Sequence, residues 1–281
     1  LVLELALRGM LVSQCCRDVP ARALLDALQK RRCLESQGGA VHRDGWRSPL
    51  SQDEAPYSIP AGWEWVRLGS VIDLVSGQHL DPSEYSTRSG ELPYFTGPSD
   101  FGPTHPVASR WTKEQRAVAK QGDILLTVKG AGVGKTNLMH IAEAAISRQL
   151  MAVRSAAFAD GYLSLILRHA TEEFRRRQVG IAIPGIGRDD VTSLPAPIPP
   201  VAEQKRIVAK VDELMRLIDD LEAKQKRKQE VRARWRSAAL DGLLSSQGRE
   251  ESAEAWNLLS RDFESLCDDV ASVSQSRSLI L

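Results

Sequence analysis

The sequence predicts an α+β protein, in which a mixed α/β globule is followed by a long coiled-coil helix and short helices flank both. Three observations predict this fold class. Short apolar runs interrupted by Gly and Pro fill residues 59–200, which is typical of short strands and helices packed into a globule. Four prolines then fall within the six positions from Pro195 to Pro200, which excludes a helix there. A charged, glycine-poor run begins directly afterwards and favours a long helix.

These changes of composition and pattern along the sequence set the predicted domain boundaries. We expect an N-terminal helical region at 1–35, a linker at 36–58, a globular domain at 59–201, a long coiled-coil helix at 202–245 and an acidic helical segment at 246–281. The chain starts with Leu rather than Met, so we expect it to be an excerpt of a longer chain.

The composition excludes some classes of protein. A hydrophobic fraction of 42% in 281 residues is enough to build a core, so we do not expect a disordered chain. No run of 18 apolar residues occurs, so we expect no membrane span. The four cysteines lack paired metal-ligand spacing, which favours free thiols in a reducing cytoplasm. The net charge of the whole chain is +1, but residues 60–100 carry a net charge of −4 and residues 101–154 a net charge of +5. The basic stretch suits a partner that carries phosphate.

Alternation and apolar runs predict the elements of the globule and its flanks. Strands are expected at 63–68, 70–76, 93–96 and 124–129, and helices at 1–8, from about 20 to 32 and at 171–178. The runs at 144–153 and 162–167 fit either a strand or a helix, because periodicity alone does not separate the two in a short apolar run.

Apolar residues after the proline-rich stretch repeat with coiled-coil spacing. From Ile207 they step by four, three, four and three residues, and Trp235 resumes the series out of strict register. The predicted interface consists of Ile207, Val211, Leu214, Ile218, Leu221 and Trp235. A helix with such a stripe must pack on another helix, either within the chain or on a second copy. A further amphipathic helix is expected at 253–270.

Residues 129–136, Lys-Gly-Ala-Gly-Val-Gly-Lys-Thr, follow a predicted strand and are similar to a phosphate-binding P-loop. The P-loop pattern needs Gly where Lys129 stands, and no clear helix follows to bind the phosphate. A P-loop nucleotidase or a nuclease is therefore the weaker alternative. We interpret the segment as a glycine-rich hairpin tip whose flanking residues, Lys129 and Lys135, approach phosphates.

No catalytic or metal-binding pattern stands out in the sequence. The five histidines are scattered singly, and there is no Cys-x-x-Cys pair, Gly-x-Ser-x-Gly elbow or methyltransferase motif. We therefore expect a binding protein that is not an enzyme and has no metal or cofactor of its own.

Four segments resemble, in the expected order, the specificity subunits of type I restriction–modification systems. Residues 194–214 join the proline-rich stretch to Glu203 and the following helix, and they resemble the end of a target-recognition domain. Residues 59–69 resemble the opening of that domain, and 122–135 resemble its central strand and loop. Residues 5–21 resemble the spacer helix between two such domains.

This resemblance implies a DNA-binding subunit that does no chemistry itself. The domain would read one half of a bipartite target in double-stranded DNA, and partner methyltransferase (M) and restriction (R) subunits would methylate adenine and cleave. S-adenosylmethionine, ATP and Mg are then expected on the partners, in the cytoplasm of a bacterium or archaeon. The family usually has two recognition domains, so this chain is either an excerpt or a half-subunit that pairs with a second copy of itself. An assembly scaffold without DNA contact is another alternative.

The resemblance places DNA contacts on loops of the globule, and polar residues in its loops and beside its strands are the candidates. They are Gln78, His79, Lys129, Lys135, Asn137, Arg148, Gln149 and Arg188. Lys and Arg suit phosphates, Arg also suits guanine, and Gln or Asn suits adenine.

Overall fold

The computed structural model describes residues 1–36, 50, 54–180, 184–245, 248, 253 and 257. It divides into two units, Leu1–Val211 and Asp212–Leu281, and each is described by itself. Within the described residues, no helix is both long and apolar enough to cross a membrane. All but residues 253 and 257 of the predicted helix at 253–270, and most of the predicted linker, lie outside the described residues.

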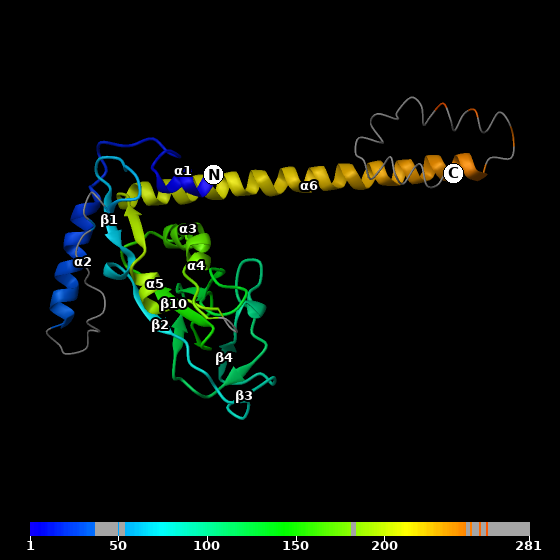
Figure 1. Ribbon diagram of the computed structural model, residues 1–281. Coiled ribbons are helices and arrows are strands. Elements are labelled where there is room, and N and C mark those ends of the chain that lie inside the picture. Colours follow the sequence, from blue (N-terminus) through cyan, green and yellow to red (C-terminus); the bar gives the residue numbers. More distant parts are fainter. Residues whose placement is uncertain are drawn as a thin grey trace. The chain divides into compact units, whose positions relative to one another are not determined.

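The elements follow the chain as Figure 1 labels them. The helices are α1 (Val2–Leu7), α2 (Ala21–Ser36), α3 (Tyr162–His169), α4 (Thr171–Arg176), α5 (Arg188–Thr192) and α6 (Val201–Ser245). The strands are β1 (Glu64–Arg67), β2 (Asp73–Ser76), β3 (Tyr85–Ser86), β4 (Leu92–Phe95), β5 (Trp111–Thr112), β6 (Val118–Lys120), β7 (Ile124–Thr127), β8 (Thr136–Leu138), β9 (Glu143–Ile146), β10 (Leu150–Arg154) and β11 (Pro195–Ile198). The predicted α+β class with a long helix after the globule is confirmed.

Two sheets form the body of the globule. One has the strand order β2-β10-β7-β8 and the other β3-β5-β4-β9-β6. Among these described strands, β4 and β9 pair in parallel, and the other neighbours pair antiparallel. Strands β9 and β10 are consecutive in the chain but belong to different sheets, so the turn at 147–149 passes from one sheet to the other.

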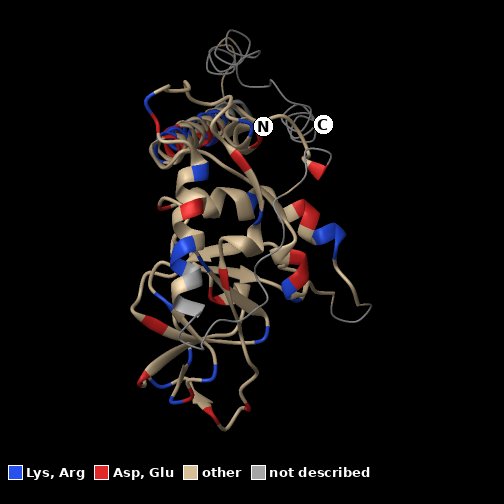
Figure 2. Ribbon diagram, turned by 90° about the vertical axis from the view of Figure 1, so that its left-hand side faces the viewer, with Lys and Arg blue, Asp and Glu red and all other residues tan. Residues whose placement is uncertain are grey.

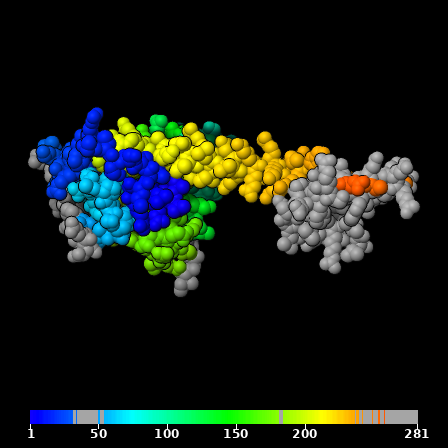
Figure 3. Space-filling view, turned by 90° about the horizontal axis from the view of Figure 1, so that it is seen from above, coloured from blue at the N-terminus to red at the C-terminus, as the bar shows by residue number. Residues whose placement is uncertain are grey.

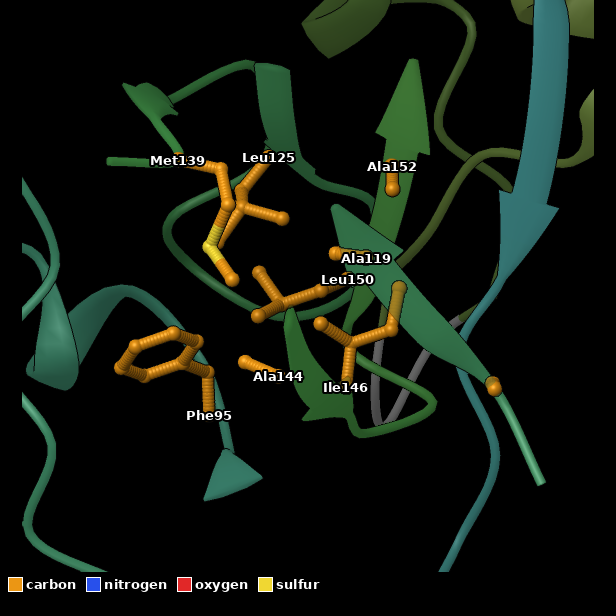
Figure 4. Packing of buried hydrophobic residues seen from close by; sticks show 9 residues of the cluster. Phe95, Ala119, Leu125, Met139, Ala144, Ile146, Leu150 and Ala152 are labelled. Atoms are coloured by element: carbon orange, nitrogen blue, oxygen red, sulfur yellow. The ribbon is translucent and has the colours of Figure 1, made fainter. Parts of the chain in front are cut away.

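Apolar side chains from both sheets meet in the core shown in Figure 4. Phe95 of β4, Leu125 of β7, Ile146 of β9 and Leu150 of β10 are each at most 1% exposed. Removing one such side chain from water stabilises a fold by about 1.5–3 kcal/mol. Because Ile146 and Leu150 flank the turn at 147–149, the core holds both ends of that turn.

The two runs that periodicity left open adopt different structures. Residues 144–153 lie in β9 and β10, separated by the turn. The run at 162–167 lies in α3, which begins after Gly161 in the left-handed region (φ +87°). Helix α3 buries five of its eight residues, so it has only a narrow polar face, and a helical period was hard to detect in the sequence.

The proline-rich stretch contains strand β11. It pairs antiparallel with β1, from Glu64 opposite Ile198 to Arg67 opposite Pro195. Each strand of a two-stranded sheet is an edge strand, so prolines without an N–H group are tolerated there. Helix α6 begins at Val201, directly after this stretch.

The side chain of Gln204 fastens the first turn of α6 to the globule. It is 0% exposed. Its carboxamide accepts a hydrogen bond from Ala159 N (2.6 Å) and donates to Pro199 O (3.0 Å) and Ala157 O (3.4 Å). Three polar backbone groups that precede α3 or α6 are thereby paired inside the protein.

The neighbouring Glu203 fastens the same turn to the N-terminal segment. Its carboxylate is 1% exposed and accepts hydrogen bonds from Trp63 Nε1 (3.0 Å) and Gln14 Nε2 (2.6 Å). Arg206 and Asp18 add an ion pair at 2.6 Å. Figure 3 shows the blue N-terminal segment beside the yellow beginning of α6. Burial raises the pKa of the Glu203 carboxyl, because desolvation disfavours its charged form.

The predicted coiled-coil stripe is divided between the two units. Ile207 and Val211, at 0% and 1% exposure, belong to the core of the first unit. In the second unit, Ile218 is 37% exposed, Leu221 64% and Trp235 60%. Leu214 is half-buried. A helix partner for the exposed part of the stripe therefore stays a prediction.

Candidate nucleic-acid interface

Loops from both sheets meet at one end of the globule. Strand β10 runs antiparallel to β2 and β7, so its first residues lie beside the last residues of those strands. In the other sheet, the parallel strands β4 and β9 end side by side at Phe95 and Ile146. We name the loops at this end, residues 77–79, 96–98, 128–135 and 147–149, the loop cluster.

Hydrogen bonds hold the turn at 147–149 against the other three loops. Four of them join backbone groups: Ser147 N to Phe95 O (2.9 Å), Gln78 N to Ile146 O (3.0 Å), Gly77 N to Leu150 O (3.0 Å) and Val128 N to Gln149 O (2.8 Å). The hydroxyl of Ser147 donates to Thr96 O and accepts from Gln149 N (3.1 Å). The backbone of the turn is therefore fixed, while the side chains of Arg148 and Gln149 are exposed.

The cations of the loop cluster differ from most others on the globule. Figure 2 shows Lys and Arg interspersed with Asp and Glu over the ribbon. The ion pairs of the globule include Arg110–Asp100, Lys113–Glu91, Arg116–Glu84, Lys120–Glu143 and Arg154–Asp123. Lys129, Lys135 and Arg148 have no carboxylate partner in the part of the chain that the structure describes. Arg88 and Arg168, outside the cluster, have none there either. Unpaired cations are available to neutralise phosphates.

The glycine-rich segment joins β7 to β8 as a hairpin loop. Thr127 N donates to Lys135 O (2.9 Å), and Gly134 N donates to Thr127 O (3.0 Å). Gly130 and Gly134 have φ values of +83° and +87°, which glycine adopts without strain. A strand, β8, follows where a P-loop needs a helix, so the nucleotidase alternative is not favoured. Lys129 and Lys135 are both exposed on this loop.

Six of the eight sequence-based candidates lie in the loop cluster, and all six are exposed. They are Gln78, His79, Lys129, Lys135, Arg148 and Gln149. His79 Nε2 lies 3.9 Å from Asp81 Oδ1, which is a long contact between two exposed groups.

The other two candidates have structural contacts. Asn137 of β8 is 8% exposed and donates from Nδ2 to Gly102 O (2.9 Å), so it is not available to DNA in this conformation. Arg188 is half-buried and donates from Nη1 to Leu74 O and Ser76 Oγ, both at 3.1 Å. It therefore supports β2 behind the cluster. The sequence placed Asn137 on the glycine-rich loop, whereas it lies in β8, and a DNA contact by Arg188 stays a prediction.

Sequence reasoning missed Asp100, which fixes the loop at 96–98. This residue is 7% exposed. Its Oδ2 accepts hydrogen bonds from Thr96 N (2.6 Å) and Thr96 Oγ1 (2.9 Å), and its Oδ1 accepts from Ser109 Oγ (3.2 Å). Arg110 Nη1 lies 3.9 Å from the same carboxylate. The available signal was the turn-forming sequence Thr-Gly-Pro-Ser-Asp, which ends on an acid that can bond back to the loop.

The family model described as the type I restriction modification DNA specificity domain matches residues 60–232, which is more than half of the chain. The chain belongs to this family. The match begins just before β1 and ends within α6, so it contains the globule, the loop cluster and the proline-rich junction. It confirms the resemblance found in the sequence.

Curated relatives and solved structures agree with this family. The chain is 27% identical over its whole length to the specificity subunit of type I restriction enzyme EcoEI and 26% identical to that of EcoAI, both from Escherichia coli. It covers 49% and 50% of those proteins, so it spans about half the length of the curated relatives it matches.

A solved chain from work on complex assembly and conformational transition of the type I R-M system is 28% identical, with a TM-score of 0.56 over 74% of this chain and 52% of that one. The HsdS subunit from Thermoanaerobacter tengcongensis shares the fold, with a TM-score of 0.52 over 88% of this chain and 56% of that one, at 24% identity.

Proposed function

We propose that this chain recognises DNA for a type I restriction–modification system and that the loop cluster is its DNA-contacting surface. The observation that carries the proposal is the cluster itself. In a member of a DNA specificity family, exposed cations and carboxamides converge on a fixed backbone, and its cations lack acidic partners there. Lys129 and Lys135 would neutralise phosphates, while Arg148, Gln149 and Gln78 would reach base edges.

The family supports a wider proposal about partners. One recognition domain suits one half of a bipartite target in double-stranded DNA. Methyltransferase subunits would methylate adenine and a restriction subunit would cleave, so S-adenosylmethionine, ATP and Mg would be bound by those subunits in the cytoplasm. This chain would have no catalytic role. The exposed Leu221 and Trp235 suit packing on a second long helix, either from the rest of a longer chain or from a second copy.

Salt dependence of DNA binding tests the loop cluster. Each phosphate contact contributes about −0.9 to the slope of log K against log salt concentration. We expect Lys129→Ala and Lys135→Ala each to make this slope shallower by about that amount on random duplexes. The matched control is Lys113→Ala, because Lys113 is exposed but lies 3.9 Å from Glu91. Slopes equal to the wild-type value in both cluster variants would contradict the assignment of the surface.

A domain exchange separates recognition from scaffolding. Residues 60–195 would be replaced by the same region of a specificity subunit with a known target, and methylated sites would be mapped by sequencing after assembly with methyltransferase subunits. We expect the methylated half-site to follow the exchanged region. Unchanged sites would favour the scaffold alternative, and ATP hydrolysis lost in Lys135→Ala would favour the nucleotidase alternative.

A further inference from the structure

The absence of a side chain at position 97 leaves the space in which the carboxamide of Gln149 lies. Gly97 is buried in the loop after β4, and Gln149 is exposed at the end of the turn at 147–149. A Cβ atom built on Gly97 would be only 2.3 Å from Gln149 Oε1 and 3.4 Å from its Cδ. The carboxamide therefore lies directly against the backbone of residue 97. The φ of Gly97 is 170°, which any residue can adopt, so a Cβ here would meet no strained backbone and would instead displace the end of the Gln149 side chain.

Hydrogen bonds fix the backbone on both sides of this contact. The backbone of Gln149 donates to Ser147 Oγ (3.1 Å) and accepts from Val128 N (2.8 Å). The loop that carries Gly97 is fixed by the Asp100 carboxylate through two hydrogen bonds from Thr96. The two backbones that carry the contact are therefore already ordered, so they lose little conformational freedom when a ligand binds.

The hydrogen-bonding groups of this carboxamide are unused within the protein. Among the described residues, neither Oε1 nor Nε2 of Gln149 has a hydrogen-bond partner. One acceptor and two donors in one plane match the N6 amino group and N7 of adenine in the major groove. An exposed and unpaired carboxamide that lies against Gly97 is therefore suited to read one base.

The geometry points to Gln149 as a specificity-determining residue that reads adenine, and to Gly97 as the positioning residue that sets its orientation. This inference rests on the proposed function, because it needs the loop cluster to face DNA. Beyond the proposed function, it specifies that one residue reads adenine at one base pair, and that this reading depends on a second residue that does not touch DNA.

Selection from a random duplex library tests the inference with the purified 281-residue chain. Bound duplexes are sequenced, and preference is scored at every position. We expect Gln149→Ala to abolish an adenine preference at a single base pair, by roughly 5- to 150-fold in relative affinity. The isosteric Gln149→Glu should move that position toward cytosine, whose N4 donates to a carboxylate. The control is Gln121→Ala, since Gln121 is exposed at the opposite end of β7.

Gly97→Ala tests positioning. We expect it to lower preference at the same base pair, to leave the salt slope of binding unchanged, and to have no further effect in a Gln149→Ala background. The control is Gly187→Ala, where a Cβ would meet only Asp190 Oδ2 at 3.7 Å. If Gly97→Ala does not fold, Asp100→Asn provides a second test, because an amide in place of the carboxylate weakens the hydrogen bonds that Thr96 donates and so loosens the loop that carries Gly97.

The outcomes separate this inference from the proposed function. If the wild-type chain selects no sequence and shows no salt-dependent binding, the proposed function fails and this inference fails with it. If the wild type selects a motif that Gln149→Ala leaves intact, only the inference is overturned. Loss of preference at several positions in Gly97→Ala, or additive effects with Gln149→Ala, would give Gly97 a general structural role and would overturn the positioning part.

Discussion

The buried Gln204 gives the sharpest prediction about stability. In Gln204→Ala, Ala159 N–H loses its partner at 2.6 Å, and the two carbonyl groups lose theirs. A buried group left without a hydrogen bond costs about 1–3 kcal/mol, and the lost side-chain methylene adds about 0.8 kcal/mol. We therefore expect the free energy of unfolding to fall by about 2–4 kcal/mol. In a unit of this size, that lowers Tm by roughly 4–16 °C.

Thermal unfolding followed by circular dichroism measures this change, and two further variants show its cause. Gln204→Leu keeps most of the volume but cannot pair Ala159 N–H, so it should retain most of the loss. Lys205→Ala, at the exposed next position, should stay within about 0.5 kcal/mol of the wild type. If Gln204→Leu were as stable as the wild type, packing alone would explain the position, and the hydrogen bonds would contribute nothing.

Three further variants test other contacts. Burial raises the pKa of Glu203 above its ordinary 4.5, so between these two values the folded state keeps a proton that the unfolded state has released. The stability that this protonated form contributes is present below pH 4.5 and is lost as pH rises through the raised pKa. In Glu203→Gln, which cannot titrate, Tm should therefore depend less on pH over that interval. Asp123→Asn should lower the free energy of unfolding in urea by roughly 1.5–3 kcal/mol, because Asp123 is buried and accepts two hydrogen bonds from Arg154 at 2.6 and 2.7 Å. Leu221→Asp should change the free energy of unfolding, measured by thermal unfolding of the globule, by less than about 0.5 kcal/mol, because Leu221 is 64% exposed. A larger loss of stability would mean that this face of the helix is covered.

The elements of the fold followed largely from local sequence, but their assembly did not. Proline chemistry located the junction before α6, alternation located β1, and an apolar run after a Gly-Asp turn located β7. The apolar run at 144–153 could not be divided in advance. Its division depends on the Ser147 hydroxyl and on long-range pairing of β10 with β2 and β7, which no short window contains.

The candidate site shows the same limit. Residues such as Gln78, Lys129 and Gln149 were chosen singly as polar residues on expected loops, and antiparallel pairing brings them together. Asn137 was misjudged because β8 reverses the usual burial, with Asn137 facing inward at 8% exposure and Leu138 outward at 46%. The contact between Gly97 and Gln149 joins residues that are 52 positions apart, so it needed coordinates to be found.

The turn between β9 and β10 has a consequence for how this protein could acquire new targets. Its shape depends on main-chain groups, on the hydroxyl of Ser147 and on buried neighbours, and not on the side chains of Arg148 and Gln149. Those two positions can therefore accept other side chains at little cost to folding, provided that residue 97 stays small wherever a long side chain must lie against it. Under the proposed function, mutation at these positions would alter the bases that are read one at a time while the scaffold is kept, so this turn is where a redesign of specificity would begin.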